Sequence, residues 1–231
     1  MLRDVISRLV GASESTGLLP EASCIVGRAS GVARGISSST RHVFTRNSLL
    51  GPYPEGMETV AFGMGCFWCS EGHFAGLAKS PTSGIFTTLV GYCQGVTQNP
   101  TYEEVCSGQT NHVEVVQVVY DPRIRSFSSL LKDFWELHDP TTPNRQGNDA
   151  GTQYRSGIYF TTPAQRELAE QTKRSYQSAL NERGIAAEIV TEIEPLRNFF
   201  PAEDYHQQYD FKAGSRQYCG MRPTGVSLPQ S

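Results

Sequence analysis

The chain has 231 residues, 38% of them hydrophobic and 19% charged, with a formal net charge of −3. This length allows one domain of ordinary size with a substantial core. The small negative charge gives no support for a nucleic-acid surface, and no apolar run approaches the roughly 20 residues that a membrane-spanning helix needs. Six cysteines spread along the chain are typical of a reduced compartment with some redox-active thiols, not of a small disulfide-rich protein.

Residues 1–50 differ in composition from the rest of the chain. They contain six arginines, no lysine, three acidic residues and nine serines, so their net charge is +3. The first ten residues can form a short amphipathic helix with Arg3 and Arg8 near one another. Such a leader, without a long apolar segment, is typical of an organelle transit peptide, and we predict a mitochondrial location with a plastid as the alternative. A disordered leader on a cytosolic protein is the other interpretation.

A candidate nucleophile lies within the stretch 59–77, TVAFGMGCFWCSEGHFAGL. A short apolar run, 60–64, ends at a glycine, Cys66 follows, and the next residues have helical spacing. Cys66 is therefore expected where a strand turns into a helix. Unpaired backbone N–H groups and the positive end of the helix dipole favour the nucleophilic thiolate there. Phe67 and Trp68 would form an apolar wall beside the sulfur, although a buried structural cysteine beside two core aromatics is the alternative.

The rest of the chain alternates irregularly between strands and helices. Polar stretches at 91–102 and 139–151 are expected to be loops, and a long loop in a compact domain is often functional. The fold is expected to begin near Glu58 and to become an irregular tail from Lys212. This alternation suits a two-layer α+β domain better than a long parallel sheet. Strands are predicted at 85–90, 114–120, 155–160 and 187–193, and helices at 126–137, 162–183 and 201–209.

The helix predicted at 162–183 has the clearest end signals. Thr162 is a plausible N-cap and Pro163 suits the first helical position. Gln165 would complete a capping box with Thr162. Gly184 then ends the helix.

A nucleophilic cysteine needs neighbours that handle protons and oxygen, and the acids and phenols in or beside loops are the candidates. Glu114 stands at the start of an apolar strand, where burial would raise its pKa and make it an acid near neutral pH. A solvated glutamate at a strand end is the alternative. Tyr102, in a turn, and Tyr154, which follows Asp149 at the end of a polar loop, can each donate a hydrogen bond to an oxygen near the sulfur. The alternative is that each tyrosine only packs at the edge of the hydrophobic core, as tyrosines at strand ends often do.

Other cysteines suggest further thiol chemistry. Cys66 and Cys69 form a C-x-x-C pair, which alone predicts a thioredoxin-like dithiol or half of a zinc site. Zinc needs four ligands and no second pair with suitable spacing appears, so we expect no metal. Cys93 and Cys106 are expected to be small buried hydrophobes. Cys219 lies in a Gly-rich tail, and a cysteine on a mobile segment can reach a distant thiol and form a disulfide.

Six motifs together resemble the peptide methionine sulfoxide reductase A family from about Glu58 to Val226. The resemblance implies an α+β fold, a two-layer α/β sandwich with a ferredoxin-like βαβ core and a long irregular C-terminal tail, and leaves 227–231 as a short extension. The motifs are GCFW at Gly65–Trp68, NPTYEEVCSG at Asn99–Gly108, HVEVVQVVYDP at His112–Pro122, FWELHDPT at Phe134–Thr141, RQGNDAGTQYRS at Arg145–Ser156 and AEDYHQQY at Ala202–Tyr209.

The resemblance also implies a reaction, the reduction of methionine-(S)-sulfoxide in oxidised proteins and as the free amino acid. A thiolate attacks the sulfoxide sulfur, methionine leaves, and the resulting sulfenic acid becomes a disulfide that thioredoxin reduces. It implies no metal or organic cofactor, and nothing suggests more than a monomer. The implied roles are Cys66 as nucleophile, Glu114 as proton donor to the oxygen, Tyr102 and Tyr154 as hydrogen-bond donors to it, Asp149 as support, Phe67 and Trp68 as the methyl pocket, His206 at its edge and Cys219 as resolving thiol.

The sequence departs from the family pattern at three places. Cys69 stands where members usually have glycine after GCFW, Cys93 lies in a loop where a small residue is common, and 225–227 reads Gly-Val-Ser where many members have a second recycling cysteine. We predict that Cys219 resolves the sulfenic acid, with Cys69 as the alternative. A non-enzymatic redox adaptor built around C-x-x-C, in which Cys69 matters as much as Cys66, is the competing interpretation of the chain.

Overall fold

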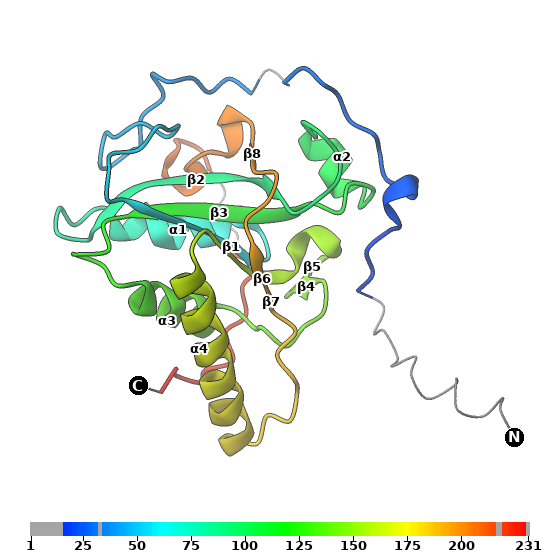
Figure 1. Ribbon diagram of the computed structural model, residues 1–231, viewed down its shortest axis with the longest axis vertical. Helices are drawn as coiled ribbons and strands as arrows, with labels where there is room; N and C mark the ends of the chain where they lie inside the picture. Colours follow the sequence, from blue (N-terminus) through cyan, green and yellow to red (C-terminus); the bar gives the residue numbers. More distant parts are fainter. Residues whose placement is uncertain (1–15, 32–33, 216–218, 230–231) are drawn as a thin grey trace, which may run out of the picture.

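The computed structural model describes residues 16–31, 34–215 and 219–229 (Figure 1). Its centre is a six-stranded sheet in the order β7–β6–β1–β3–β2–β8, in which β6 and β7 are parallel and the other neighbours are antiparallel. A short hairpin of β4 and β5 stands apart from it. The strands are β1 Glu58–Met64, β2 Ile85–Cys93, β3 Val113–Tyr120, β4 Arg145–Gln146, β5 Asp149–Ala150, β6 Ser156–Phe160, β7 Glu192–Pro195 and β8 Phe200–Pro201.

Three helices, α1, α3 and α4, cover one side of the sheet (Figure 1). In Figure 1, α1, α3 and α4 lie below it, and α1 contacts β2 and β3 while α4 contacts β6, β7 and α3. The predicted α+β class is confirmed. The four strands joined by α1 and α3 have the order β6–β1–β3–β2, which is compatible with the predicted ferredoxin-like core. Every helix in the described ranges is too short or too polar to cross a bilayer. The helices are α1 Phe67–Leu77, α2 Tyr102–Cys106, α3 Phe127–Leu137 and α4 Pro163–Glu182.

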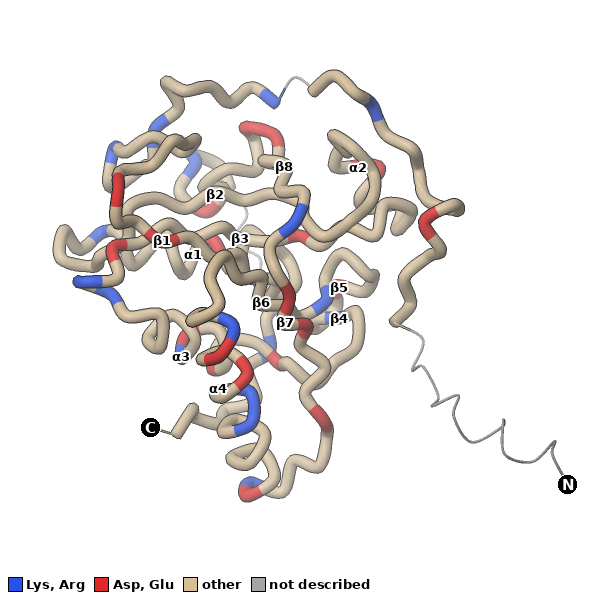
Figure 2. Tube along the Cα trace, viewed as in Figure 1, with Lys and Arg blue, Asp and Glu red and all other residues tan. Residues whose placement is uncertain are grey.

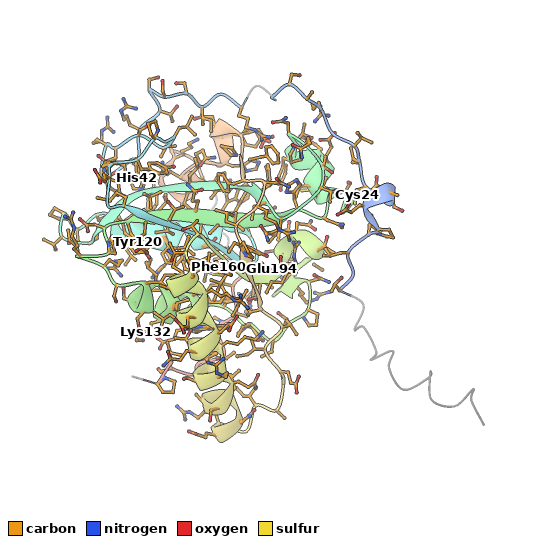
Figure 3. All side chains as sticks on the ribbon, in the orientation of Figure 1. Cys24, His42, Tyr120, Lys132, Phe160 and Glu194 are labelled. Atoms are coloured by element: carbon orange, nitrogen blue, oxygen red, sulfur yellow. The ribbon has the colours of Figure 1, made fainter. Side chains whose placement is uncertain are left out.

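The core follows from the alternation of side chains along the strands. Phe62 of β1 points into the large core beneath the sheet, where its ring lies 5.4 Å from that of Phe74 and 5.3 Å from that of Phe134. Its neighbour Ala61 points to the opposite face and joins a smaller cluster with Tyr159. Side chains fill the space between the sheet and the helices (Figure 3). Each fully buried Phe side chain contributes about 1.5–3 kcal/mol.

Local signals set the helix starts. Thr162 caps α4 by accepting from the Gln165 backbone N–H (3.2 Å), and Pro163 is the first helical residue, as predicted. The Gln165 side chain accepts from the Thr161 N–H (2.8 Å). The Gln165 side chain thus bonds to the residue before the N-cap, so the predicted reciprocal bond between Gln165 and the Thr162 N–H is displaced by one residue. A complete capping box instead starts α2, the helix that the sequence analysis missed.

Two predicted elements near the C-terminal end of the domain are wrong. The strand predicted at 187–193 is β7, which begins only at Glu192. The backbone N–H of Ile189 donates to the Gln177 side chain (2.8 Å) and that of Val190 to the Pro140 carbonyl (2.9 Å), so neither pairs with a strand. The helix predicted at 201–209 is β8 followed by two 3₁₀ turns, Asp204–His206 and Tyr209–Phe211.

The predicted leader is largely part of the folded body. Residues 16–31 and 34–57 run along the domain above the sheet (Figure 1). Basic residues lie along this segment (Figure 2), and two of them meet acids of the domain: Arg28 pairs with Glu104 of α2 (2.8 and 2.5 Å) and Arg34 lies 3.6 Å from Glu203. His42 is fully buried. The folded part therefore begins well before Glu58, and the amphipathic helix predicted at the N-terminus lies outside the described residues.

Candidate active site

Cys66 lies at the junction of β1 and α1, where the sequence predicted it. It is the N-cap residue of α1 and is partly buried. Gly65 before it has a φ of +85°, and a Cβ there would come within 2.5 Å of the Gln146 Cβ atom. Only glycine meets both conditions, because a side chain would be strained by the backbone and blocked by Gln146. The turn therefore fixes the sulfur at the positive end of α1.

Glu114 is brought to this turn by the pairing of β1 with β3. The two strands are antiparallel, with Phe62 opposite Val116, so the end of β1 lies beside the start of β3. Glu114 is 2% exposed and its Oε2 atom accepts from the Phe67 backbone N–H (3.2 Å). Burial raises the pKa of Glu114 to about 8; the Phe67 N–H lowers it and the charge of Asp149 raises it. The solvated alternative is wrong: this is a neutral acid next to the thiol at pH 7.

Two phenols lie within electrostatic reach of this acid. Tyr102 is the first residue of α2, and Tyr154 is the last residue of the 3₁₀ turn Thr152–Tyr154. Burial, and secondarily the charge of Glu114, raises the pKa of both phenols, and the charge of Cys66 also acts on Tyr154. Both side chains therefore keep their protons at neutral pH and can donate hydrogen bonds.

An aromatic wall stands beside the sulfur. Phe67 is buried, and Trp68 is partly buried and stacks on Tyr209 with ring centroids 4.0 Å apart and 10° between planes. The Trp68 Nε1–H donates to Nδ1 of His206 (3.0 Å), whose ring lies 4.4 Å from that of Tyr102. Burial lowers the pKa of His206 to about 4, so the ring is neutral. Because Nδ1 accepts, the proton is on Nε2, which is buried and has no hydrogen-bond partner among the described residues.

Asp149, on β5, is the second acid of the site. Burial raises its pKa and the nearby Arg222 lowers it. Its Oδ2 atom is buried without a partner in the described part of the chain. A Cβ at Gly220 would come within 2.3 Å of this oxygen, so the C-terminal tail packs directly against Asp149.

Three of the thiols form a row. All six cysteines are present as thiols, and the Cys69 thiol is hydrogen-bonded to those of Cys66 and Cys219. Cys69 is 5% exposed whereas Cys219 is exposed. The hydrogen bond with Cys219 lowers the pKa of Cys69, but the bond with Cys66 and burial outweigh it and raise that pKa to about 12. Cys93 is buried as predicted, whereas Cys106 is exposed, contrary to the prediction.

Sequence reasoning missed the residues that hold the aromatic wall in place. Glu71 on α1 is 1% exposed and accepts from the Thr88 hydroxyl (3.2 Å) and from the Gln208 backbone N–H (2.5 Å). The Gln208 bond attaches the segment that carries His206 and Tyr209 to α1, and the Thr88 bond ties Glu71 to β2. One signal was visible, because Glu71 is a charged residue on the apolar face of a helix, four residues after Phe67.

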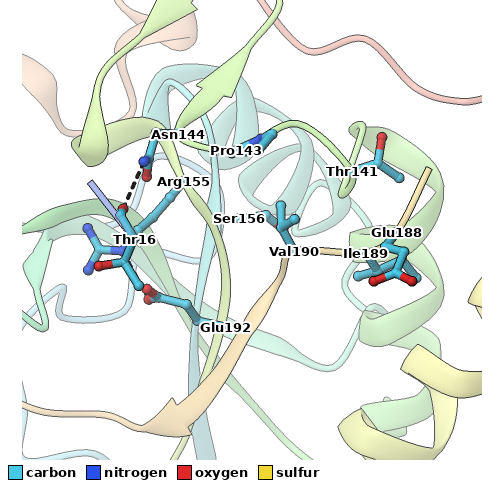
Figure 4. Close-up of a pocket in the computed structure, with 10 residues that line it drawn as sticks. All are labelled: Thr16, Thr141, Pro143, Asn144, Arg155, Ser156, Glu188, Ile189, Val190 and Glu192. Atoms are coloured by element: carbon cyan, nitrogen blue, oxygen red, sulfur yellow. Dashed lines mark hydrogen bonds and ion pairs between the residues drawn. The ribbon is translucent and has the colours of Figure 1, made fainter. Parts of the chain in front are cut away.

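A hollow of about 620 Å³ elsewhere on the molecule does not offer comparable chemistry (Figure 4). At its rim the Asn144 side chain donates to the Thr16 carbonyl (2.9 Å). Its Arg155 and Glu192 are paired with each other (2.9 Å). Within the described ranges, no group of three or more His, Cys, Asp and Glu residues could hold a metal ion.

Comparisons with known proteins point to one family. Residues 58–227 match the family model for peptide methionine sulfoxide reductase. The peptide methionine sulfoxide reductase MsrA 1 of Caulobacter vibrioides is 51% identical over 199 residues, 86% of this chain and 88% of its own. The Agrobacterium fabrum MsrA is 48% identical over 215 residues, 93% of this chain and 95% of its own, which leaves 16 of the 231 residues outside the match.

Solved structures agree. The methionine sulfoxide reductase A of Corynebacterium diphtheriae superposes with a TM-score of 0.76 at 37% identity and covers 92% of this chain and 99% of its own. Mxr1 from Saccharomyces cerevisiae in reduced form has a TM-score of 0.64 at 33% identity, and the match covers 79% of this chain and all of the yeast chain.

Proposed function

Because the chain belongs to the peptide methionine sulfoxide reductase family, we propose that the residues around Cys66 reduce methionine-(S)-sulfoxide, in proteins and as the free amino acid. Family membership makes the chain an enzyme and not a non-catalytic redox adaptor. The observation that carries the proposed mechanism is the buried Glu114 carboxyl, bonded to the N–H of the residue next to Cys66 (3.2 Å). A thiol and a neutral acid thus share one small site.

The first step is attack of the Cys66 thiolate on the sulfoxide sulfur. The sulfoxide oxygen is a poor leaving group until it is protonated, and Glu114, with a pKa of about 8, holds a proton at neutral pH. Glu114 gives this proton to the oxygen while Tyr102 and Tyr154 donate hydrogen bonds to it. Methionine leaves, the oxygen is transferred to Cys66 as a sulfenic acid, and the substrate sulfur is reduced by two electrons.

The aromatic wall binds the methyl group of the substrate. Phe67 and Trp68 supply the apolar surface, and the stack on Tyr209 together with the bond to His206 fixes the indole plane. The Nε2–H of His206 has no hydrogen-bond partner among the described residues, so it can donate to a bound substrate. Asp149 supports the site by raising the pKa of Glu114.

The enzyme is regenerated through a disulfide. A second thiol condenses with the Cys66 sulfenic acid and expels water, and an external dithiol of the thioredoxin class reduces the disulfide. Cys219, which is exposed, is the thiol at which that reductant acts.

We place the enzyme in the mitochondrion, with the targeting signal confined to residues 1–15. One observation supports this narrower leader. Residues 16–31 and 34–50 pack on the domain, through contacts such as that of Arg28 with Glu104 and the burial of His42. Removal of a longer leader would take away contacts of the folded body.

The test is stereospecific consumption of methionine sulfoxide. With dithiothreitol as reductant, the wild-type chain is expected to consume the S epimer of a blocked methionine sulfoxide and leave the R epimer untouched. Cys66→Ser is expected to be inactive and Cys24→Ser, a thiol on the N-terminal segment, fully active. Consumption of the R epimer, or activity of the Cys66→Ser variant, contradicts the proposal.

A further inference from the structure

The buried thiol of Cys69 is not explained by a two-cysteine cycle. It is hydrogen-bonded on one side to the nucleophile, Cys66, and on the other side to the exposed Cys219. A cysteine that only filled the core would need neither contact. The three thiols thus form a path from the partly buried Cys66, through the buried Cys69, to the exposed Cys219.

Helix geometry suits a disulfide between the first two thiols. Cys66 is the N-cap of α1 and Cys69 stands in its first turn, where its backbone N–H donates to the Cys66 carbonyl (3.1 Å). Side chains three residues apart on a helix have Cβ atoms about 5–6 Å apart. A disulfide needs about 3.5–4.5 Å, so a small adjustment in the first turn closes the bond.

The C-terminal tail supplies the second junction. The backbone N–H of Gly220 bonds to the Cys69 sulfur, and Gly220 is buried against Asp149. The docking of this residue places the neighbouring Cys219 beside Cys69. The tail is thereby fixed against the middle thiol of the row.

In place of direct resolution by Cys219, which the sequence analysis predicted, we propose that Cys69 is a relay thiol, which condenses with the oxidised Cys66 and then passes the disulfide to Cys219. This inference rests on the proposed function, since it needs the sulfenic acid that the reduction of methionine sulfoxide leaves on Cys66. It assigns a catalytic role to a residue that stands where the family pattern has glycine.

The relay balances in two steps. In the first, the Cys69 sulfur attacks the Cys66 sulfur, the S–O bond breaks, and the oxygen leaves as water with the Cys69 proton. In the second, the Cys219 sulfur attacks Cys69, the 66–69 bond breaks, Cys219 loses its proton, and Cys66 returns as a thiol or thiolate. The two-electron oxidation now resides in a 69–219 disulfide, whose outer sulfur is exposed to an external dithiol.

The relay makes a stoichiometric prediction for turnover without reductant. A wild-type chain is expected to make two methionines, because Cys66 is freed once before the thiols are exhausted. Cys219→Ser is expected to make one methionine and to accumulate a 66–69 disulfide. Cys69→Ser is expected to make one methionine and to keep a dimedone-reactive sulfenic acid at Cys66 at least tenfold longer than the wild type. Cys24→Ser is the matched control and is expected to behave as wild type.

Rapid quenching and peptide mapping decide between routes. Appearance of 66–69 before 69–219 in the wild type supports the relay. A 66–219 disulfide as the first linkage, with unchanged sulfenic-acid lifetime in both Cys69→Ser and Cys69→Ala, overturns it. Production of no methionine by the wild type overturns the proposed function instead, so the two failures are distinguishable.

Discussion

Replacing Glu114 by glutamine is expected to lower activity and to raise stability. Glutamine keeps the size of the side chain and an oxygen that can accept the Phe67 N–H, but it carries no acidic proton. Loss of a positioned general acid reduces kcat by about 10²- to 10⁴-fold. We expect this loss below pH 8, where the wild-type carboxyl still holds its proton.

The stability change follows from the raised pKa of Glu114. The pKa is about 8 in the folded protein and about 4.3 in an unfolded chain, so above pH 4.3 folding must take up or retain a proton at a free-energy cost. The cost grows between these two values and levels off above the folded one. It is on the order of 1 kcal/mol at pH 5 and 4 kcal/mol at pH 8, because one pH unit corresponds to about 1.36 kcal/mol. Glutamine removes this cost.

Urea unfolding at pH 5 and pH 8, with kcat measured on a methionine sulfoxide peptide, checks both expectations. The gain in unfolding free energy of Glu114→Gln over the wild type should be roughly 3 kcal/mol larger at pH 8 than at pH 5. Glu104→Gln is the matched control with the opposite sign, since the Arg28 hydrogen bond lowers the pKa of Glu104. A Glu114→Gln variant with full kcat at pH 7, or with the same stability gain at both pH values, would refute the reasoning.

Two further predictions concern the N-terminal segment. The Arg34 guanidinium lies 3.6 Å from Glu203, whose carboxylate accepts from the Tyr102 backbone N–H (3.2 Å). Arg34→Met should therefore destabilise the protein by about 3 kcal/mol and lower kcat. Arg28→Met, at an exposed ion pair, should leave the urea midpoint nearly unchanged, and equal urea midpoints of the two variants would contradict this. A fluorescent protein fused to residues 1–15 should reach mitochondria as efficiently as one fused to residues 1–50, and a plastid or cytosolic signal would contradict the location.

Local patterns predicted the site where short-range chemistry determines it. An apolar run that ends in glycine and cysteine placed Cys66 at a helix start, and an acid inside a valine-rich strand marked Glu114. Both deductions need only the periods of strand and helix. The stack of Trp68 on Tyr209 could not be found this way, because 140 residues separate the partners and nothing local specifies their contact.

Composition misled where long-range contacts compete with it. An arginine- and serine-rich leader indicates a detachable segment, yet the Arg34 side chain is only slightly exposed because it lies against one acid far along the chain, Glu203. The strand predicted at 187–193 fails for the same reason, since a side chain of α4 takes the Ile189 N–H. The C-x-x-C motif alone also left the role of Cys69 undecided. Its contact with Cys219 depends on how the C-terminal tail packs, which the motif does not specify.

The start of α1 interacts with Glu114 both before and after this acid gives up its proton. The Phe67 N–H donates to Oε2 of Glu114. In the neutral acid Oε2 is therefore the accepting oxygen, and Oε1 is the oxygen left to carry the proton. When that proton moves to the substrate oxygen, a buried carboxylate forms. The N–H bond lowers the pKa of Glu114, which means that it favours the charged form. The start of the helix beside which the nucleophile lies therefore also stabilises the Glu114 carboxylate once its proton has left. Burial keeps the proton on Glu114 before the transfer, and the Phe67 N–H opposes that effect of burial during the transfer.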